Sequence, residues 1–409
     1  MTKSGQKKYL QELPEENGTG TARPNTTRMA AGLLLMTMVL AAFGLTMLYS
    51  ASSNNVTAAA AYFRNQMIWS IVGSFLGIIA IAGGYRFFCR KSLIWLGACA
   101  LLLIWARFSR EINGAHRWII VGSFRLQPSE LAKIAVALFV AWYCSEYVRT
   151  FNDFTRLKHG IWGIGAGVGS IILLILWGDD MGTSVLVAAM AFFTMFAGNL
   201  RWRYFLIPMS VLPLTVLYIK HFDPMRWGRM TIFLDPETNQ RAGGYQLWNS
   251  LLALGSGSWH GLGLTDSRLK ASYLPEAHTD FIIAIIGEEL GFLGVMAVIL
   301  FYILWGFFAF RIALAARNRM GMLLGCALTL GVLLQAIINL GVVSGMFPTK
   351  GMPAPFISYG GSNMVCSLLA TSFLVSIALD TAVPDYSEKL WAQIKRWCRL
   401  DFSKDEVAE

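Results

Sequence analysis

The chain has 409 residues, of which 55% are hydrophobic and only 14% are charged, and its formal net charge is +10 at pH 7. Charged residues make up about a quarter of a soluble domain, so this composition excludes an ordinary soluble protein. The apolar residues form blocks of about 20, the length that crosses a bilayer as a helix. Lys and Arg lie in short segments between these blocks, as is typical of membrane-protein loops, so the net charge does not indicate nucleic-acid binding.

The apolar blocks predict an all-α integral membrane protein with about ten transmembrane helices. The first block follows a polar tail, residues 1–28, and is longer than the apolar core of about 7–15 residues in a signal peptide, so we expect a retained helix. The expected helices span residues 29–50, 67–85, 92–108, 129–149, 160–177, 182–198, 204–219, 281–310, 321–343 and 362–380. They form one membrane domain, residues 29–380, followed by a polar tail, residues 381–409.

The distribution of Lys and Arg predicts the orientation of these helices. The cation-rich loops and both tails fall on one side of the membrane, which is cytoplasmic by the positive-inside rule. The segment between the third and fourth helices is an exception, because it lies on the outer side and still carries Arg107, Arg110, Arg117 and Arg125. An anionic ligand would account for these cations, and pairing with Glu111 is a simpler partial explanation.

The largest outer segment spans residues 220–280, which is too long for a simple turn. Its aromatic residues, such as Trp248 and Trp259, argue against disorder. We therefore expect a large ordered extracytoplasmic loop between the seventh and eighth helices. No internal repeat is evident, which disfavours an inverted-repeat transporter.

Two clusters of polar residues lie where outer loops meet helices. Pro128 marks the start of the fourth helix, and Glu130 and Lys133 share one face of that helix because they are three residues apart. This pair could line a polar cavity or form a structural ion pair. Asp179 and Asp180 occupy a tight turn before the sixth helix, where they could bind a cation or cap the helix.

A third cluster, residues 273–280, leads directly into the eighth helix. Asp280 is placed at the outer mouth of the membrane, where a half-buried carboxylate can act as a general base. Asp280 could equally cap the helix and complement its dipole. Glu288 and Glu289 follow about 12 Å further along the helix. Acids at that depth require a polar interior or a partner such as Lys133.

A fourth cluster consists of residues 348–351 and 355–362, which enter the tenth helix. Its glycines let the backbone approach a ligand, and amides and hydroxyls at a helix N-terminus suit an anion such as a diphosphate. A tight re-entrant turn without a ligand is the alternative.

These four clusters, in this order, resemble the SEDS family of bacterial shape, elongation, division and sporulation proteins. The resemblance covers roughly residues 29–380 and rests on ISYGGS at residues 357–362 and PEAHTDF at residues 275–281. Ala277, IIGEELG at residues 285–291 and PTKG at residues 348–351 are similar to the division branch rather than the elongation branch. The chain departs from the family pattern at Asp179, Asn249 and Asn363.

The resemblance implies a peptidoglycan glycosyltransferase that polymerises lipid II, with inversion and with undecaprenyl diphosphate as the leaving group. Asp280 matches the essential aspartate of the family and would take the proton of the acceptor hydroxyl. Candidate substrate-binding residues are Arg117, Glu130, Lys133, Asp180, Arg226, Arg229, His278, Lys350, Ser358 and Ser362. A divalent cation, Mg or Mn, is a candidate cofactor with no assigned ligands.

The family also implies a partner and a location. The expected partners are lipid II, undecaprenyl diphosphate-linked glycan, a class B penicillin-binding protein with transpeptidase activity and other divisome proteins, with no nucleic acid. The expected location is the bacterial cytoplasmic (inner) membrane at the septum. Two other functions remain open, namely a lipid II flippase that uses intramembrane Glu130, Lys133, Glu288 and Glu289, and a non-catalytic recruiter of the transpeptidase. The recruiter would not need Asp280.

Overall fold

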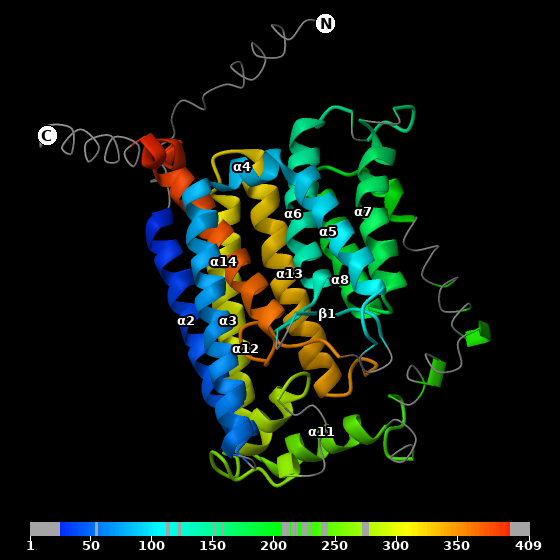
Figure 1. Ribbon diagram of the computed structural model, residues 1–409, viewed down its shortest axis with the longest axis vertical. Coiled ribbons are helices and arrows are strands. Elements are labelled where there is room, and N and C mark those ends of the chain that lie inside the picture. The colour runs from blue at the N-terminus through cyan, green and yellow to red at the C-terminus, as the bar shows by residue number, and fades with distance from the viewer. Residues whose placement is uncertain are drawn as a thin grey trace, which may run out of the picture.

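The described part of the chain is almost entirely helical (Figure 1). The computed structural model describes residues 25–53, 56–111, 115–121, 124–150, 152–156, 159–206, 244–271, 278–349 and 351–392, with isolated positions between 213 and 238. The α-helices are α2 (Thr26–Ala51), α3 (Val56–Gly83), α4 (Tyr85–Arg90), α5 (Ser92–Arg107), α6 (Pro128–Glu146), α7 (Ile161–Trp177), α8 (Met181–Ala197), α11 (Tyr245–Ser256), α12 (Ile282–Leu314), α13 (Arg319–Val343) and α14 (Gly361–Ala382). The short 3-10 turns are Trp202–Phe205 and Leu269–Ala271.

Five of the described helices, α2, α3, α12, α13 and α14, are long and apolar enough to cross a membrane. Helices α5, α7 and α8 are shorter and also apolar. A helix satisfies its own backbone hydrogen bonds, which makes it the form in which such segments enter lipid. The chain is therefore a multi-pass membrane protein, and the all-α prediction is confirmed. The helix expected at residues 204–219 lies largely outside the described residues.

The second helix differs most from its expected bounds. It begins at Val56 rather than at residue 67, because an alanine-rich turn precedes the apolar block and favours helix. The added turns carry polar and aromatic residues, including Tyr62 and Gln66, which lower the local hydropathy. Their side chains face the interior of the bundle, so these residues belong to the candidate site described below.

Helices α13 and α14 occupy the centre of the bundle. Their most apolar stretches are 67% and 72% buried, against 22% for α3 and 28% for α12. Helix α14 packs on α2 and α3, and α13 packs on α6, α8 and α12. Helices α2, α3 and α12 thus lie on one side of the centre, and α5 to α8 lie on the other (Figure 1).

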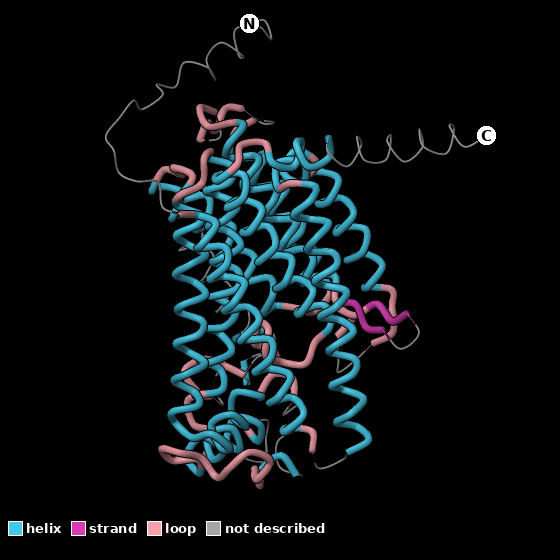
Figure 2. The backbone as a smooth tube through the Cα atoms, turned by 90° about the vertical axis from the view of Figure 1, so that its left-hand side faces the viewer, coloured by secondary structure: helices cyan, strands magenta, loops and turns pink. Residues whose placement is uncertain are grey.

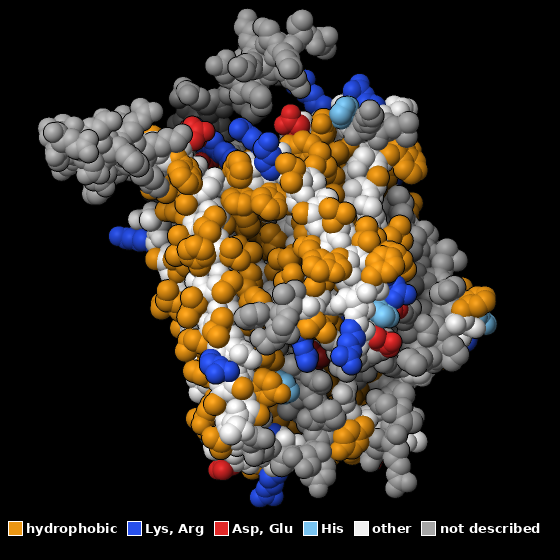
Figure 3. All heavy atoms as spheres, viewed as in Figure 1, with side chains coloured by type: hydrophobic (Ala, Val, Ile, Leu, Met, Phe, Trp, Pro, Cys, Tyr) orange, Lys and Arg blue, Asp and Glu red, His pale blue; other side chains and the backbone are white. Residues whose placement is uncertain are grey.

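The two ends of the bundle differ. Helix α2 begins and α14 ends at the same end, which is the top in Figure 1, whereas α11 lies at the opposite end. A two-stranded antiparallel hairpin, β1 (Ile119–Val121) and β2 (Phe124–Leu126), lies at mid-height rather than at an end (Figure 2). On the face shown in Figure 3, hydrophobic side chains cover much of the flank of the bundle, as expected for a surface in lipid.

Helix α12 is broken at Gly291, where the sequence predicts one long helix. Gly291 has φ +70° and ψ −166°, a backbone conformation that is essentially confined to glycine. An ideal Cβ on Gly287 would lie 3.4 Å from Val295 Cγ2, although residues eight apart in a straight helix are separated by about 12 Å. The helix axis therefore turns sharply at Gly291.

The segment after α11 supplies the hydrogen bonds that the break removes. The N–H groups of Leu262 and Gly263 donate to the carbonyls of Glu288 and Glu289, both at 3.0 Å. On the other side of the break, Phe292 N–H donates to Ser258 O at 2.9 Å. This close backbone contact connects residues 258–263 to α12 and satisfies polar groups that would otherwise be costly to bury.

We expect Gly291→Ala to destabilise the protein by about 2 kcal/mol or more. Alanine at this backbone conformation costs about 1–3 kcal/mol, and its Cβ would lie 2.4 Å from Gly261 N. Gly97→Ala is the matched control, because a Cβ on Gly97 in α5 meets nothing within 4 Å. Unfolding of the purified variants in mixed micelles measures the effect, and equal stability of the two variants would contradict it.

Candidate functional site

Asp280 lies directly before α12, where the start of that helix meets the segment between α13 and α14. The side chain of Asn339 in α13 donates to Asp280 O at 2.8 Å and to Met352 O at 2.7 Å. An ideal Cβ on Gly351 would lie only 2.5 Å from Asp280 Oδ2. The carboxylate of Asp280 therefore lies against the backbone of Gly351, and its main chain is held to the same segment.

That segment, residues 351–360, runs through the bundle without regular secondary structure. Four consecutive carbonyls each accept a hydrogen bond from a side chain of a surrounding helix, at 2.6 to 3.3 Å. Irregular backbone is tolerated at membrane depth only where such partners exist. The donors to Met352, Pro353, Ala354 and Pro355 are Asn339, Gln335, Asn363 and Tyr302, in that order.

An aromatic cluster covers the other side of this segment. The ring of His278 stacks on Tyr62 at 4.5 Å between centroids, and Tyr359 packs 5.0 Å from Tyr62. Tyr359 N–H also donates to His278 O at 3.0 Å. His278 and Asp280 are thus fixed to the same irregular segment, two residues apart.

Gln66 connects α3 to the irregular segment, residues 351–360. Its amide group donates to Ser358 O at 3.2 Å and accepts from Gly360 N–H at 3.2 Å. Gln66 is 1% exposed, so both bonds are formed away from water. A buried amide that pairs two backbone groups sets the path of the chain into α14.

Ser358 and Ser362, predicted to bind substrate, make hydrogen bonds within the protein. Ser358 Oγ accepts from Ala354 N–H at 2.8 Å, and Ser362 Oγ accepts from Gln127 N–H at 2.9 Å. Both side chains are buried. These contacts support the re-entrant turn that the sequence left open as an alternative.

Asp180 caps a helix, as one of its two interpretations predicts. Its Oδ1 accepts from Thr183 N–H in the first turn of α8 at 3.2 Å. Its Oδ2 accepts from Gln127 Nε2 at 2.9 Å and from Ser129 Oγ at 2.7 Å. Asp180 is therefore fully engaged in joining α8 to the start of α6.

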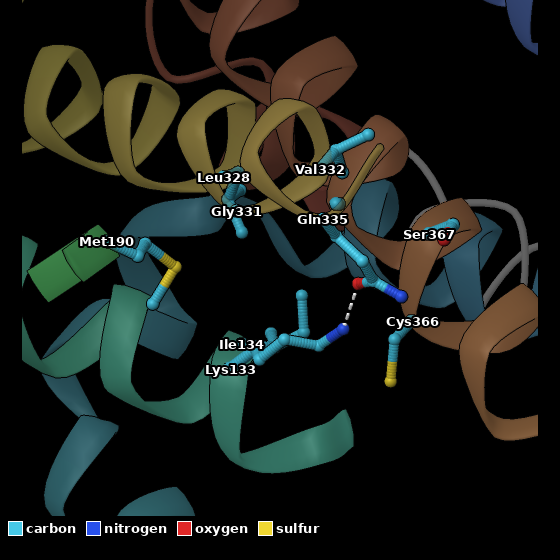
Figure 4. Close-up of a pocket in the computed structure, with 10 residues that line it drawn as sticks. Lys133, Ile134, Met190, Leu328, Gly331, Val332, Gln335, Cys366 and Ser367 are labelled. Carbon is cyan, nitrogen blue, oxygen red and sulfur yellow. Dashed lines mark hydrogen bonds between the residues drawn. The ribbon is translucent and has the colours of Figure 1, made fainter. Parts of the chain in front are cut away.

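Glu130 and Lys133 form a buried ion pair with 2.7 Å between Oε2 and Nζ. The lysine also donates to Gln335 Oε1, and Figure 4 shows its side chain directed at this amide. Glu130 Oε2 makes no further directed hydrogen bond among the described residues. Lys133 and Gln335 border a cavity of about 20 Å³, which is room for about one water molecule.

Glu288 and Glu289 bind the segment of residues 265–270, so the suggestion that Lys133 is their partner is wrong. Glu289 pairs with Lys270 at 2.9 Å and accepts from Ser50 Oγ of α2. Glu288 accepts from Ser267 Oγ and, at 2.8 Å, from Arg268 N–H. The two carboxylates tie residues 265–270 to the end of α2, because the break at Gly291 brings that loop beside α12.

Of the remaining basic residues that the sequence predicts to bind substrate, only one lies among the described residues. Arg117 lies in the extended segment before β1 and is partly buried, and its Nε has no hydrogen-bond partner among the described residues. Arg226, Arg229 and Lys350 lie outside the described residues. The described part of the chain contains no group of three or more His, Cys, Asp or Glu side chains placed to hold a metal ion.

Sequence reasoning missed the residues that shape the site from the helices. Gln335 and Asn339 lie one turn apart on α13 and hold two successive carbonyls of the irregular segment. Their signal was available, because amide side chains within an apolar helix normally face a partner or a cavity. Tyr62 and Gln66 were missed because they lie before the expected start of their helix.

Comparisons with known proteins agree on one family. A family model described as a cell cycle protein of the FtsW, RodA and SpoVE type matches residues 31–382. A probable peptidoglycan glycosyltransferase FtsW from Trichlorobacter lovleyi is 35% identical over 361 residues, which are 85% of this chain and 92% of the relative. Another, from Taylorella equigenitalis, is 37% identical over 324 residues, or 77% of this chain and 87% of the relative.

Solved structures show the same fold. A chain from a study of how a peptidoglycan synthase complex coordinates polymerization and crosslinking superposes with a TM-score of 0.72 and 26% identity, covering 86% of this chain and 98% of that one. The rod shape determining protein RodA of Thermus thermophilus superposes with a TM-score of 0.63 at 24% identity, covering 85% of this chain and 96% of that one. The second likeness concerns the fold alone.

We expect Lys133→Met to destabilise the protein by about 3–5 kcal/mol, because it leaves Glu130 as a buried unpaired charge. The double variant Glu130→Gln with Lys133→Met removes both charges and should recover most of that loss. Stability of the two purified variants in mixed micelles is the measurement. If the single variant is as stable as the double variant, Glu130 does not depend on Lys133 for its charge.

Proposed function

Because the chain belongs to the FtsW, RodA and SpoVE family of cell cycle proteins, we propose that it is a peptidoglycan glycosyltransferase that polymerises lipid II with Asp280 as general base. The observation that carries this proposal is the position of the Asp280 carboxylate. It lies against Gly351, where a half-helix and an irregular segment meet. A carboxylate so placed is held by its surroundings and is still partly exposed, so an acceptor hydroxyl can reach it.

The reaction requires few groups from the protein. Asp280 takes the proton from the 4-hydroxyl of the acceptor N-acetylglucosamine as its oxygen attacks C1 of the donor sugar. The bond from C1 to the diphosphate breaks, the electron pair goes to undecaprenyl diphosphate, and the configuration at C1 inverts. One base is sufficient for this displacement, and the remaining catalysis is electrostatic stabilisation of the leaving group.

The cations proposed to stabilise the leaving group differ in setting. Arg117 lies in the segment before the hairpin, where its guanidinium can bind an anion such as the diphosphate. Lys133 is paired with Glu130 and bound to Gln335, so its role is to position the irregular segment rather than to contact phosphate. Arg226, Arg229 and Lys350 are proposed as contacts on the family resemblance.

His278 is the rival base. Its ring stacks on Tyr62, and its backbone carbonyl accepts from Tyr359 N–H, so the ring is held beside the irregular segment. An imidazole ring N–H held in this way can donate a hydrogen bond to a phosphate oxygen. We therefore assign His278 to substrate binding.

The arrangement gives no support to a flippase. The four intramembrane groups that such a pathway would use belong to two separate clusters, one around Lys133 and one around Lys270. The cavity beside Lys133 has about 20 Å³, far less than a disaccharide headgroup occupies. A purely structural recruiter of the transpeptidase would not require the exact placement of a carboxylate beside Gly351.

The proposed orientation and location follow from charge and family. Both termini are placed in the cytoplasm, because basic residues such as Arg86, Arg90 and Lys91 gather at the end where α2 begins and α14 ends. The proposed cellular location is the cytoplasmic membrane of a bacterium at the division septum. The proposed partners are a class B penicillin-binding protein, which crosslinks the glycan, and other divisome proteins.

Asp280→Asn should lower the initial rate of glycan polymerisation about 100-fold or more, because the amide keeps the size of the side chain but cannot accept a proton. The assay uses purified lipid II and the full-length protein with its transpeptidase partner. His278→Gln is measured beside it and should retain more activity. An Asp280→Asn protein with a near-normal rate would exclude Asp280 from the chemistry and leave it a structural role beside Gly351 and Asn339.

Gly351→Ala should also lower the polymerisation rate, by about 100-fold, because a Cβ there would displace the Asp280 carboxylate and a shift of about 1 Å costs that much in a well-placed active site. Gly255→Ala in α11 is the control, since its Cβ meets nothing within 4 Å. A normal rate for Gly351→Ala would show that the carboxylate does not need its position against this backbone.

A further inference from the structure

A basic pocket lies at the end of the bundle where α6 ends and α7 begins (Figure 1). It has a volume of about 550 Å³ and is formed by the loop between α6 and α7 together with the segment that follows α8. Three arginines, Arg149, Arg201 and Arg203, line it. A pocket of this size can hold a small polar headgroup, and the proposed mechanism makes no use of it.

The two loops that carry the arginines are joined by Asn152. Its Nδ2 donates to Asn199 O at 2.8 Å, and its Oδ1 accepts from Arg201 N–H at 3.1 Å. Tyr204 OH donates to Asn152 O at 2.8 Å. From the centre of the bundle, Arg319 of α13 donates to Gly198 O at 2.7 Å. The arginines are therefore presented by a braced frame and not by two independent loops.

Asp153 is the single carboxylate that lines the pocket among the described residues. Its Oδ1 accepts from Thr155 N–H at 3.0 Å and from Thr155 Oγ at 2.7 Å, and Arg156 lies 3.4 Å from its Oδ2. The hydrogen bonds from Thr155, with a smaller effect of Arg156 and Arg201, lower the pKa of Asp153. One ionised carboxylate faces three guanidinium groups, so the pocket carries a net positive charge.

Aromatic side chains place this pocket at the boundary between lipid and water. Phe154 stacks on Tyr204 at 5.8 Å and meets Trp162 edge-on at 5.1 Å. Trp202 is 76% exposed beside two of the arginines. Exposed tryptophan next to the ends of apolar helices is typical of the headgroup region of a bilayer. The cations thus stand at the depth of lipid phosphates.

We propose that this pocket binds the headgroup of an acidic phospholipid, with Arg201 and Arg203 as ligands of the phosphate. Guanidinium groups pair with phosphate oxygens through two parallel hydrogen bonds, and basic pockets between helix ends on the cytoplasmic side suit anionic headgroups. The positive-inside rule requires only that these loops carry positive charge. Here the loops are also joined by hydrogen bonds, which hold the arginines around a pocket. The proposal does not depend on the glycosyltransferase activity.

The test measures binding of phosphatidylglycerol to the purified full-length protein in detergent by native mass spectrometry, with phosphatidylcholine as the uncharged comparison. The wild-type protein should bind phosphatidylglycerol in preference. Arg201→Gln with Arg203→Gln should weaken that binding about 30-fold, because each cation near an anionic surface contributes about fivefold. Arg201→Lys with Arg203→Lys keeps the charge and should lose less.

The matched control is Arg28→Gln with Lys389→Gln, which removes the same charge from exposed positions at the start of α2 and after α14, on the other side of the bundle (Figure 1). It should bind phosphatidylglycerol as the wild type does. Equal loss in both double variants, or equal binding of phosphatidylcholine, would overturn the proposal.

Glycerol phosphate is the third probe, and displacement of the lipid by it at equal concentration would assign a soluble phosphate instead. If the double glutamine variant does not fold, Arg203→Gln alone should still weaken binding about fivefold.

Discussion

The structure depends on one constraint, which is that irregular backbone inside a membrane bundle must find every hydrogen-bond partner within the protein. The segment between α13 and α14 meets this constraint with four side-chain donors to four consecutive carbonyls. Each donor comes from a helix that spans the bundle, so the path of the segment is set by the packing of those helices. The rigidity of the candidate site is therefore a consequence of bundle assembly and not a property of the loop itself.

The break in α12 is the second instance of the same constraint. Backbone groups of residues 258–263 replace the helical bonds lost at Gly291, and Glu288 and Glu289 anchor the loop that follows. The short half-helix that begins after Asp280 is thus held at both ends, by the irregular segment at one end and by the outer loop at the other. Asp280 is positioned through this half-helix, and Glu288 and Glu289 anchor the half-helix to residues 265–270 and to the end of α2.

The polar groups at the basic pocket are arranged differently from those around Asp280. Around Asp280, polar groups are buried and paired, because an unpaired buried group costs free energy. At the basic pocket, the arginines are exposed, and the hydrogen bonds that join their two loops are exposed or half-buried. Buried pairs give a fixed geometry for a reaction, whereas exposed cations on a braced frame remain available to an anion from the membrane surface.

Much of this protein is determined by its sequence alone. Apolar blocks are local features, so most helices were predicted within a few residues, and PEAHTDF and ISYGGS identified the segments that meet at Asp280. The tertiary structure decided what depends on distances between remote residues. It paired Glu289 with Lys270 rather than Lys133, broke α12 at Gly291, and brought Gln66, Gln335 and Asn339 to one irregular segment. Hydropathy is summed along the chain, whereas a buried charge or carbonyl is satisfied by whichever group lies nearest in space, and packing alone decides which group that is.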